Sequence, residues 1–317
     1  MSDGFEPLLN LLADGQTHTG VRLAETLGLT RAAVWKRIEG LRELGLGIQA
    51  DGRGYRLSRP FHPLDAEDIR ARLSDTSLPV ELRFLVDSSN SELARTRHGK
   101  APAQVLLAES QSAGRGRRGR SWRSPPGSGI YLSLAWRFES GLTGLSALSL
   151  VAGMAAAKTL RVHGASSVGL KWPNDLWAAN QKLGGCLIDI SGSAEGPCEA
   201  IIGLGINVDL PQAEGIDQPW TDLARLGVGT NRNHLAADLI NSLSDHAERL
   251  DRHGFAAFID DWPDYDLLAG REITVTAARG EPLNGTASGV DQQGRLGLDS
   301  DQGRQWIAQG EISVRPR

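Results

Sequence analysis

Residues 130–138 read IYLSLAWRF and carry the clearest strand pattern in the chain. Large apolar side chains recur at every second position from Ile130 to Phe138, as in a strand with one buried face. Apolar runs elsewhere predict further strands at residues 82–86, 105–108, 168–171, 183–190 and 200–208. Helical spacing predicts helices near residues 91–97, 145–163, 233–251 and 255–261. Because helices and strands do not alternate regularly, we expect a mixed sheet rather than a chain of βαβ units.

The length and composition fit a folded protein of two or three domains. The chain has 317 residues, of which 40% are hydrophobic and 23% charged, and its 34 Lys plus Arg nearly balance its 38 Asp plus Glu. The charge of the whole chain therefore indicates neither a nucleic-acid nor a membrane partner. The two cysteines form no C-x-x-C pair and no H-E-x-x-H occurs, so we expect no disulfide framework and no metal site.

The amino-terminal residues and the longest uncharged run argue against export and membrane insertion. Asp3 and Glu6 lie where a signal peptide is basic and then apolar. Residues 140–157 are uncharged, but seven of these eighteen residues are Gly, Ser or Thr. Leucines recur there at helical spacing, which predicts a buried helix. We expect a soluble cytoplasmic protein without a membrane partner.

Residues 1–58 follow the pattern helix, helix, helix, hairpin. The helices are expected to begin at Pro7 and to cover residues 21–27 and 31–44. Gly28 is expected to end the second helix in a left-handed conformation, and Thr30 to cap the third. A short glycine-containing turn between these two helices is the spacing of a helix-turn-helix, and the hairpin at residues 48–57 has the shape of a wing.

The third helix and the hairpin carry a local excess of positive charge. Between Arg31 and Arg59 there are seven basic and three acidic residues, although the whole chain has a net charge of −4. Such a face attracts DNA phosphates and lets helix-borne side chains reach base edges. The alternative is a basic surface for protein contacts, but the agreement of helix, cap, basic face and wing favours DNA. The expected DNA-contacting residues are Arg31, Lys36, Arg37 and Arg53.

Residues 111–122 read QSAGRGRRGRSW, and the segment 114–123 is called the arginine loop below. Gly114 to Gly119 match G-x-G-x-x-G, but the dinucleotide fingerprint requires a helix directly after it. Here two prolines follow and then the strand at residues 130–138, so we reject the dinucleotide fold. A protein-kinase loop is also rejected, because the chain has no V-A-I-K, H-R-D or D-F-G segment.

The arginine loop carries five positive charges and no acid, at Arg115, Arg117, Arg118, Arg120 and Arg123. Repulsion among them predicts a mobile loop that a polyphosphate or a mixed anhydride orders. Glycines between the arginines let backbone N–H groups approach an anion closely. This favours ligand binding over the two alternatives, a solvated basic loop and a second DNA contact.

Four further motifs lie at or near predicted strand ends. DSSN at residues 87–90 can cap a helix or hold a small polar head group. KWPND at residues 171–175 and KLGG at residues 182–185 each contain one of only five lysines in the chain. GLGINV at residues 203–208 predicts a strand whose glycines leave room for a flat ligand. Each motif alone is weak evidence.

In this order the motifs closely resemble the family of bifunctional biotin–protein ligases and biotin-operon repressors. The resemblance spans essentially the whole chain, and the arginine loop followed by KWPND is its most specific part. It implies an α+β fold with a winged helix-turn-helix DNA-binding domain at residues 1–58. A class II synthetase-like mixed-sheet ligase domain at residues 65–268 and an SH3-like small β-barrel at residues 269–317 follow. Two prolines within residues 60–63 fit a linker after the first domain.

The resemblance also implies which residues contact each substrate. Biotin contacts are expected from Ser88, Ser89, Asn90, Gln111, Arg115, Gly116, Arg117 and Lys182. Nucleotide contacts are expected from Arg118, Arg120, Trp122, Asn207 and Trp306. The family commonly has Ser-Thr-Asn where this chain has Ser88-Ser89-Asn90, so we expect slightly looser positioning of the biotin head.

The implied reaction joins biotin and ATP, which carries Mg²⁺, to biotinyl-5′-adenylate. Biotin then passes to a lysine of a biotin carboxyl carrier protein. Arg115, Arg117 and Lys182 are expected to offset the charge at the α-phosphorus. The biotin carboxylate needs no base, but the acceptor lysine must lose a proton, and Asp175 is the candidate to accept or steer it.

The same ligand is expected to couple the two activities. Biotinyl-adenylate that orders the arginine loop drives formation of a homodimer, which places two winged domains on a two-fold operator and represses biotin-biosynthesis genes. Two alternatives stay open here: a regulator that only senses biotin, and a lipoate ligase of related chemistry. The arginine loop and the winged domain argue against the lipoate ligase.

Overall fold

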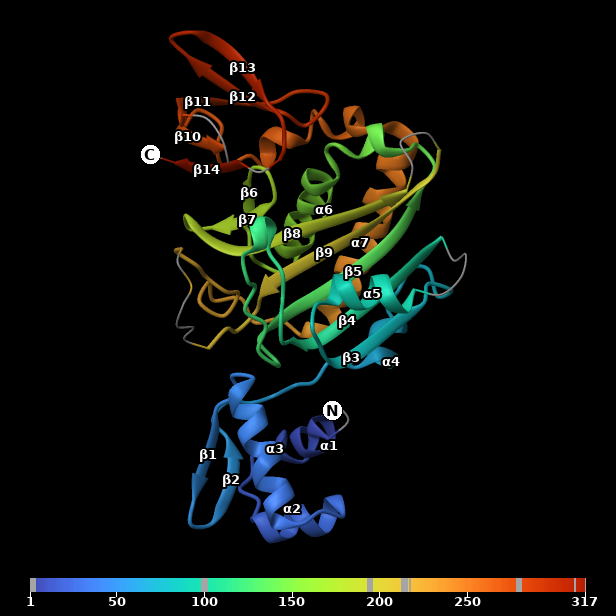
Figure 1. The fold of residues 1–317 in the computed structure, drawn as a ribbon, viewed down its shortest axis with the longest axis vertical. Coiled ribbons are helices and arrows are strands. Elements are labelled where there is room, and N and C mark those ends of the chain that lie inside the picture. Colours follow the sequence, from blue (N-terminus) through green and yellow to red (C-terminus); the bar gives the residue numbers. More distant parts are fainter. Residues whose placement is uncertain are drawn as a thin grey trace.

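The computed structural model describes residues 4–97, 102–192, 196–211, 216, 218–277, 281–310 and 312–316. Within these ranges a winged helical unit, a central sheet with helices and a second sheet follow one another along the chain (Figure 1). This order confirms the predicted α+β class. No helix in the described ranges is long and apolar enough to cross a membrane.

The winged unit packs three helices against a hairpin. Its elements are α1 Phe5–Leu12, α2 Gly20–Leu27, α3 Arg31–Glu43, β1 Ile48–Asp51 and β2 Gly54–Leu57. As predicted, Thr30 caps α3 by accepting a hydrogen bond from the Ala33 amide, and Gly28 ends α2 at φ +63°. The expected helix start at Pro7 is two residues too late, because the first turn of a helix tolerates a proline.

The central sheet is mixed, as predicted. Its strands are β3 Val80–Val86, β4 Ala103–Gln111, β5 Gly129–Phe138, β6 Gly169–Lys171, β7 Asp175–Ala178, β8 Gln181–Gly192 and β9 Cys198–Asn207. They lie in the order β3-β4-β5-β9-β8-β7-β6, and the β3–β4 pair is parallel while the others are antiparallel. The helices of this unit are α4 Ala66–Arg70, α5 Ser89–Thr96, α6 Leu148–Val162 and α7 Arg232–His253.

The alternation along β5 separates a core face of the sheet from a site face. Ile130 and Leu134 are fully buried in the large core that includes side chains of α6 and α7. Tyr131, on the opposite face, packs in a smaller cluster with a leucine of α5. Ser133 lies on the same face as Tyr131 and is also fully buried. The polar member of this strand therefore points toward α5, where the predicted site residues begin.

Two elements differ from the sequence-based expectation. The strand β7 is absent from the predicted set, because its four residues are too few to show a period. Residues 255–261 were expected to form an α-helix, but the structure has a 3-10 helix at Phe255–Phe258. Short connectors commonly adopt this tighter helix, and Gly254 at φ +66° separates it from α7.

The carboxyl-terminal sheet is antiparallel throughout. Its strands are β10 Glu272–Ala277, β11 Leu283–Val290, β12 Leu296–Ser300, β13 Gly303–Ile307 and β14 Ile312–Pro316, in the order β13-β12-β11-β10-β14. It shares the large core with the central unit, since Ile273 and Leu296 are buried in that cluster. The Trp172 indole N–H donates to the Gly294 carbonyl at 3.0 Å, which fixes the two units together.

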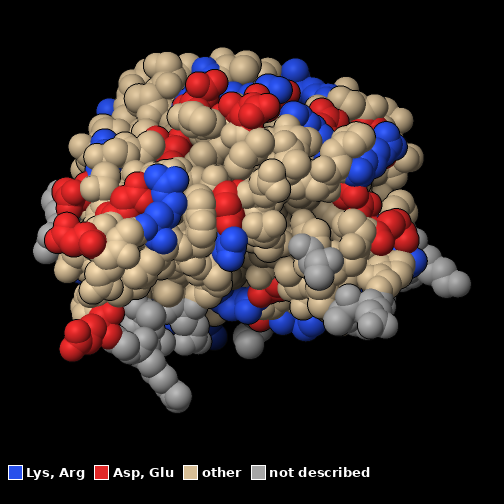
Figure 2. All heavy atoms as spheres, turned by 90° about the horizontal axis from the view of Figure 1, so that it is seen from above, with Lys and Arg blue, Asp and Glu red and all other residues tan. Residues whose placement is uncertain are grey.

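Charges of both signs are mixed over the end of the molecule that lies away from the winged unit. Figure 2 looks onto this end and shows acidic and basic side chains interspersed among uncharged ones. In the second sheet, Arg295 and Arg304 are each paired with an aspartate at 2.6 Å. The face shown therefore presents no field of one sign to a polyanion.

A buried ion pair ties the linker of the winged unit to the central sheet. Arg232 donates to Glu109 at 2.6 Å, and both side chains are less than 10% exposed. Glu109 also accepts from the amides of Leu64 at 2.9 Å and Gly127 at 2.7 Å. Arg232 further donates to the carbonyl of His62 at 3.0 Å. The pair thus binds the linker on one side and the exit of the arginine loop on the other.

Replacing Glu109 is expected to destabilise the whole fold. Glu109→Ala leaves the Arg232 guanidinium buried without its partner, so the free energy of unfolding should fall by about 3–5 kcal/mol. Urea unfolding followed by tryptophan fluorescence measures this change. The control is Asp68→Ala, which removes an exposed pair with Arg72 on the protein surface and should shift the midpoint little. Equal midpoints for the two variants would contradict the assignment.

Candidate active site

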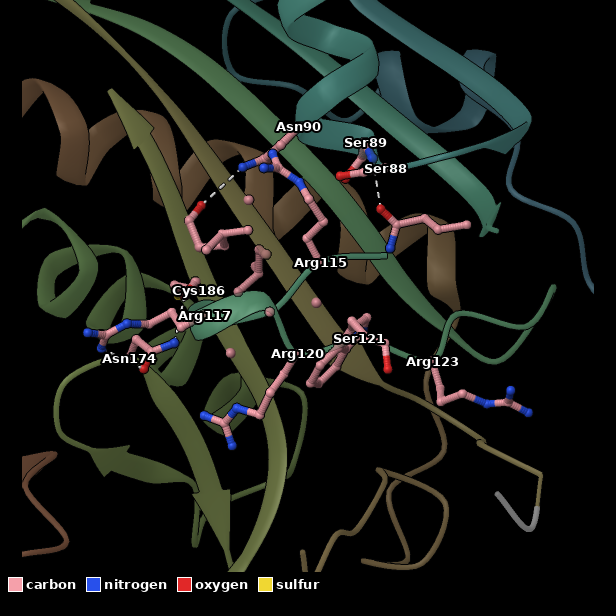
Figure 3. Close-up of a pocket in the computed structure, with 18 of the residues that line it drawn as sticks. Ser88, Ser89, Asn90, Arg115, Arg117, Arg120, Ser121, Arg123, Asn174 and Cys186 are labelled. Carbon is pink, nitrogen blue, oxygen red and sulfur yellow. Dashed lines mark hydrogen bonds between the residues drawn. The ribbon is translucent and has the colours of Figure 1, made fainter. Parts of the chain in front are cut away.

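The predicted substrate-binding residues surround one cavity at the site face of the central sheet (Figure 3). The cavity has a volume of about 350 Å³, within the range of small-molecule sites. All eight predicted biotin-contacting residues and two of the predicted nucleotide-contacting residues line it: Ser88, Ser89, Asn90, Gln111, Arg115, Gly116, Arg117, Lys182, Arg120 and Trp122. Residues from α5, β4, the arginine loop and β8 thus meet at a single place.

The arginine loop folds back on itself at the mouth of this cavity. The Gly116 amide donates to the Arg120 carbonyl and the Trp122 amide to the Gly114 carbonyl, both at 2.7 Å. Between them Arg118 has φ +59°, the left-handed region, which lets the loop reverse. A Cβ at Gly114 would lie 2.5 Å from the Trp122 carbonyl oxygen, so the closing of the loop requires glycine there. The mobility predicted for this loop stays a prediction.

Three charged side chains form a buried cluster beside the cavity, and of these Lys182 lines the cavity while Asp175 and Lys171 lie behind it. Lys182 lies 2.7 Å from one oxygen of Asp175, and Lys171 lies 3.6 Å from the other. Burial by itself raises the pKa of the Asp175 carboxyl, but the charges of Lys182 and Lys171 outweigh it and hold that pKa below 3.8. Burial lowers the pKa of Lys171, against the pull of Asp175. Asp175 is thus a fixed negative charge that keeps Lys182 in place.

Arg117 reaches across the cavity to the KWPND segment and to the second sheet. Its guanidinium donates to the Asn174 side-chain oxygen at 3.2 Å and to the Gly310 carbonyl (Figure 3). Asn174 is itself held by donating to the Cys186 carbonyl at 2.8 Å. Burial lowers the pKa of Arg117, yet an arginine stays charged at neutral pH. A charge fixed in this way is suited to an anionic ligand.

The start of α5 and Gln111 build the end of the cavity opposite to the charged cluster. Ser88 is the cap residue of α5, but its side chain makes no capping hydrogen bond. The capping alternative for its hydroxyl is therefore not what the structure has. The side-chain amide of Gln111 is fixed by two hydrogen bonds. Its oxygen accepts from the backbone N–H of Ser89 at 2.8 Å, and its nitrogen donates to the Ser124 hydroxyl at 2.7 Å.

Gly203 and Gly205 of β9 line the cavity and also make room for protein side chains, so the expectation that they leave room for a flat ligand stays a prediction. A Cβ at Gly203 would lie 2.3 Å from the Asn90 side chain, and a Cβ at Gly205 would lie 2.8 Å from the Trp122 ring. Within the described residues the buried Trp122 Nε1 has no hydrogen-bond partner. An unpaired buried donor is costly, so this N–H is available to a ligand.

Three predicted nucleotide-contacting residues do not line this cavity. Arg118 lines a neighbouring hollow that shares Arg115, Arg117 and Arg120 with the cavity. Asn207 is buried and donates to the Thr221 carbonyl at 3.0 Å, so it holds the segment that follows β9. Trp306 lies on β13 with 40% of its surface exposed. The roles of these residues stay predictions.

Several lining residues gave no signal in the sequence. Leu187, Ile216 and Gln218 are brought to the cavity by the pairing of β8 with β9 and by the segment after β9. Asn174 also lines the cavity, and its place in the KWPND motif is the sequence signal for it. Cys186 also lines the cavity, and burial raises the pKa of its thiol to about 12, so it is no nucleophile at neutral pH.

In the winged unit the predicted DNA-contacting residues are in different environments. Arg31 and Lys36 are exposed on α3. Arg37 is half-buried, with its guanidinium next to Gly4. Arg53, in the turn of the hairpin, is paired with Asp51 at 3.1 Å. Arg31 and Lys36 are therefore the better placed of the four to reach a polyanion.

No metal-binding cluster is present in the part of the chain that the structure describes. Groups of three or more His, Cys, Asp or Glu side chains in ligating arrangement are missing there. The positive charge in the cavity comes instead from side chains of arginine and lysine.

Comparison with known proteins agrees with this arrangement. Residues 7–56 match the HTH domain family, residues 86–207 the biotin/lipoate A/B protein ligase family, and residues 269–315 the biotin protein ligase C terminal domain. Bifunctional ligase/repressor BirA of Escherichia coli (strain K12) is 38% identical over 321 residues, which cover 99% of each chain. This chain belongs to the bifunctional biotin ligase/repressor family.

Two further relatives show how far the likeness extends. Bifunctional ligase/repressor BirA of Bacillus subtilis (strain 168) is 30% identical over 308 residues, 93% of each chain. The structure titled biotin protein ligase from Aquifex aeolicus in complex with biotin and ATP is 24% identical, has a TM-score of 0.65 and covers 75% of this chain and 99% of that one. At this identity, the comparison with the Aquifex aeolicus structure shows that the two proteins share a fold. As a member of the ligase/repressor family, the protein is a biotin ligase and a helix-turn-helix repressor.

Asp175→Asn is expected to remove a pH dependence of stability. The pKa of Asp175 is lower in the folded protein than in the unfolded chain, where it is about 3.9. Ionised Asp175 therefore adds its full contribution to the free energy of unfolding above about pH 3.9, and this contribution is lost as the pH falls through the pKa of the folded protein. At pH 7 the variant should therefore be less stable by about 3 kcal/mol, since two buried lysines lose their counter-charge. The difference between variant and wild type, measured by urea unfolding from pH 7 to pH 3, should shrink toward the acid end. A difference that is constant with pH would contradict the assignment.

Proposed function

We propose that the cavity catalyses the ATP-dependent activation of biotin and its transfer to a lysine of a biotin carboxyl carrier protein. The observation that carries this proposal is the convergence of the arginine loop, α5 and the Lys182–Asp175 cluster on one cavity, in a member of the ligase/repressor family. ATP and biotin are the substrates. Because the ligase activity uses ATP and the repressor activity uses DNA, we place the protein in the cytoplasm.

The polar end of the cavity suits the head group of biotin. Ser88 offers a hydroxyl that no cap uses, and the Ser89–Gln111 pair fixes neighbouring polar groups. Trp122 and Leu187 supply apolar surface for the rings, and the indole N–H supplies one more donor. The carboxylate of biotin then points toward Arg117 and Lys182.

In the first step a carboxylate oxygen of biotin attacks the α-phosphorus of ATP. The bond from this phosphorus to the bridging oxygen breaks, and pyrophosphate leaves with that electron pair. No proton is transferred, so the work is electrostatic: Arg115, Arg117 and Lys182 offset the charge that accumulates at phosphorus. We expect Mg²⁺ to arrive bound to the phosphates of ATP. The described residues form no cluster of metal ligands, and the charged side chains that line the cavity are cations.

In the second step the neutral amine of the acceptor lysine attacks the carbonyl of the anhydride, the carbonyl carbon–oxygen bond to the phosphate breaks, AMP leaves with that electron pair, and the amide nitrogen releases its extra proton to solvent. The amine must arrive without its proton, because a free lysine has a pKa near 10.4. The lowered pKa of Asp175 and its two lysine contacts make it a weak base. Asp175 lies behind the cavity lining, so we assign it the holding of Lys182 in place of the predicted acceptance or steering of the proton.

The winged unit is proposed to bind operator DNA of biotin-biosynthesis genes. Arg31 and Lys36 on α3 point into solvent, with the β1–β2 hairpin beside them as the wing. Biotinyl-adenylate orders the arginine loop, a homodimer forms, and two winged units engage a two-fold site. A dimerisation constant that is the same with and without biotinyl-adenylate would contradict this coupling.

Exchange of labelled pyrophosphate into ATP tests the ligase proposal. Exchange should depend on biotin and should not occur with lipoate, because the cavity and its family point to biotin. Arg117→Ala should bind biotinyl-adenylate at least tenfold more weakly, since one charge-assisted contact is lost, while the fold stays intact. Dissociation of the adenylate, followed by filtration, measures the second effect. Exchange with lipoate alone, or normal retention by Arg117→Ala, would contradict the proposal.

The DNA proposal predicts a change in salt dependence. Lys36→Ala should weaken operator binding and reduce the slope of log K against log salt by about one per protomer, because one phosphate contact is lost. The control is Lys158→Ala, which removes an exposed lysine of α6 outside the winged unit. Fluorescence anisotropy at several salt concentrations gives both slopes. An unchanged slope for Lys36→Ala would remove this residue from the interface.

A further inference from the structure

Asp189, on β8, joins the arginine loop to the site face of the sheet. One of its carboxylate oxygens accepts from the Arg115 guanidinium at 2.6 Å and from the Asn90 amide nitrogen at 3.0 Å. Arg115 and Asn90 both line the cavity and lie close together in Figure 3. Asp189 does not line the cavity, and it lies outside every motif that the sequence singled out. It nevertheless contacts Arg115 and Asn90, which line the cavity.

Asn90 is a rigid anchor for this contact. Its side-chain oxygen accepts from the Ser133 hydroxyl at 2.6 Å, and its nitrogen donates to the Leu187 carbonyl at 3.2 Å as well as to Asp189. The side chain lies directly over Gly203, where any Cβ would collide with it. Asn90 is 2% exposed, so its amide has little freedom. Asp189 is therefore held on one side by a fixed partner.

The other partner belongs to a segment with a large excess of like charge. Five arginines lie within residues 115–123, and neighbouring charges repel one another. Among the residues that the structure describes, Asp189 is the only acid within 4 Å of a guanidinium of this loop. The contact offsets part of the charge repulsion in the loop, while Arg115 remains a cation with further N–H donors for a ligand. Roughly half of the Arg115 side chain stays exposed to meet a ligand.

We propose that Asp189 is a positioning residue that fixes Arg115, and with it the entry of the arginine loop, against Asn90 so that the loop closes over the reacting phosphate. This proposal rests on the function proposed above for the loop. Asp189 acts through Arg115 and touches no reacting atom. An exposed ion pair with only a structural role would contribute little to the free energy of unfolding, and its removal would leave the position of the loop and the reaction unchanged.

Limited trypsin digestion of the full chain tests this role, because trypsin cuts after the arginines of the loop. Without substrates, Asp189→Ala should be cut in the loop about fivefold faster than wild type, since the anchoring contact is gone. Saturating biotin and ATP should slow the cutting in both proteins. The KM for ATP should rise by about the same factor, with a smaller change in kcat, because the loop must be ordered on binding. Asp189→Glu, which keeps the carboxylate, should restore most of both properties.

Asp68→Ala is the matched control, because the Asp68–Arg72 pair has similar exposure and lies away from the cavity. Loop cutting and a KM for ATP that are equal in Asp189→Ala and Asp68→Ala would overturn the proposal. A lower melting temperature with unchanged loop cutting would also overturn it, since the role would then be structural. If biotin and ATP give no protection even to the wild-type loop, the proposed function of the loop fails first, and the role of Asp189 fails with it.

Discussion

The ion pair between Lys182 and Asp175 is the interaction on which the site depends. Asp175 begins β7 and Lys182 lies near the start of β8, so the pairing of these two strands brings the charges together. Lys171 contacts the same carboxylate from β6. Both lysines are about nine-tenths buried, and Asp175 supplies the negative charge that lies between them. The edge of the sheet thus offers a fixed cation to the cavity.

The two faces of the central sheet have different roles: one packs in the hydrophobic core and the other supports the cavity. On one face, large apolar side chains at alternate positions of β5 and β9, such as Leu132 and Ile202, belong to the core that includes α6 and α7. On the other face Ser133, Gly203 and Gly205 are small, so Asn90 and Trp122 can lie directly on the strands. The cavity is therefore lined both by residues of β8 and β9 and by side chains from α5 and the arginine loop that lie on these strands.

Contacts near the arginine loop join the central sheet to both neighbouring units. The buried Glu109–Arg232 pair holds Gly127, which follows the loop, together with the linker that leads to the winged unit. An ion pair between Arg59 and Asp209 joins the same linker to the segment after β9. Within the loop itself, Arg117 donates to the Gly310 carbonyl between β13 and β14. The loop therefore contacts the second sheet directly, whereas the linker is held by residues outside the loop.

The sequence by itself determined the classes of element and the chemistry of the loop. The period-two pattern at residues 130–138, the caps at Gly28 and Thr30, and the alternation of glycine and arginine are local features, and local physics fixes them. Tertiary structure decided which side chains meet. The four-residue strand β7 has no readable period, and Asp189 and Leu187 reach the site only through the register of β8 against β9. The glycines of β9 show the same division: a sequence shows that space is needed, whereas packing decides how that space is shared between the cavity and the neighbouring side chains of Asn90 and Trp122.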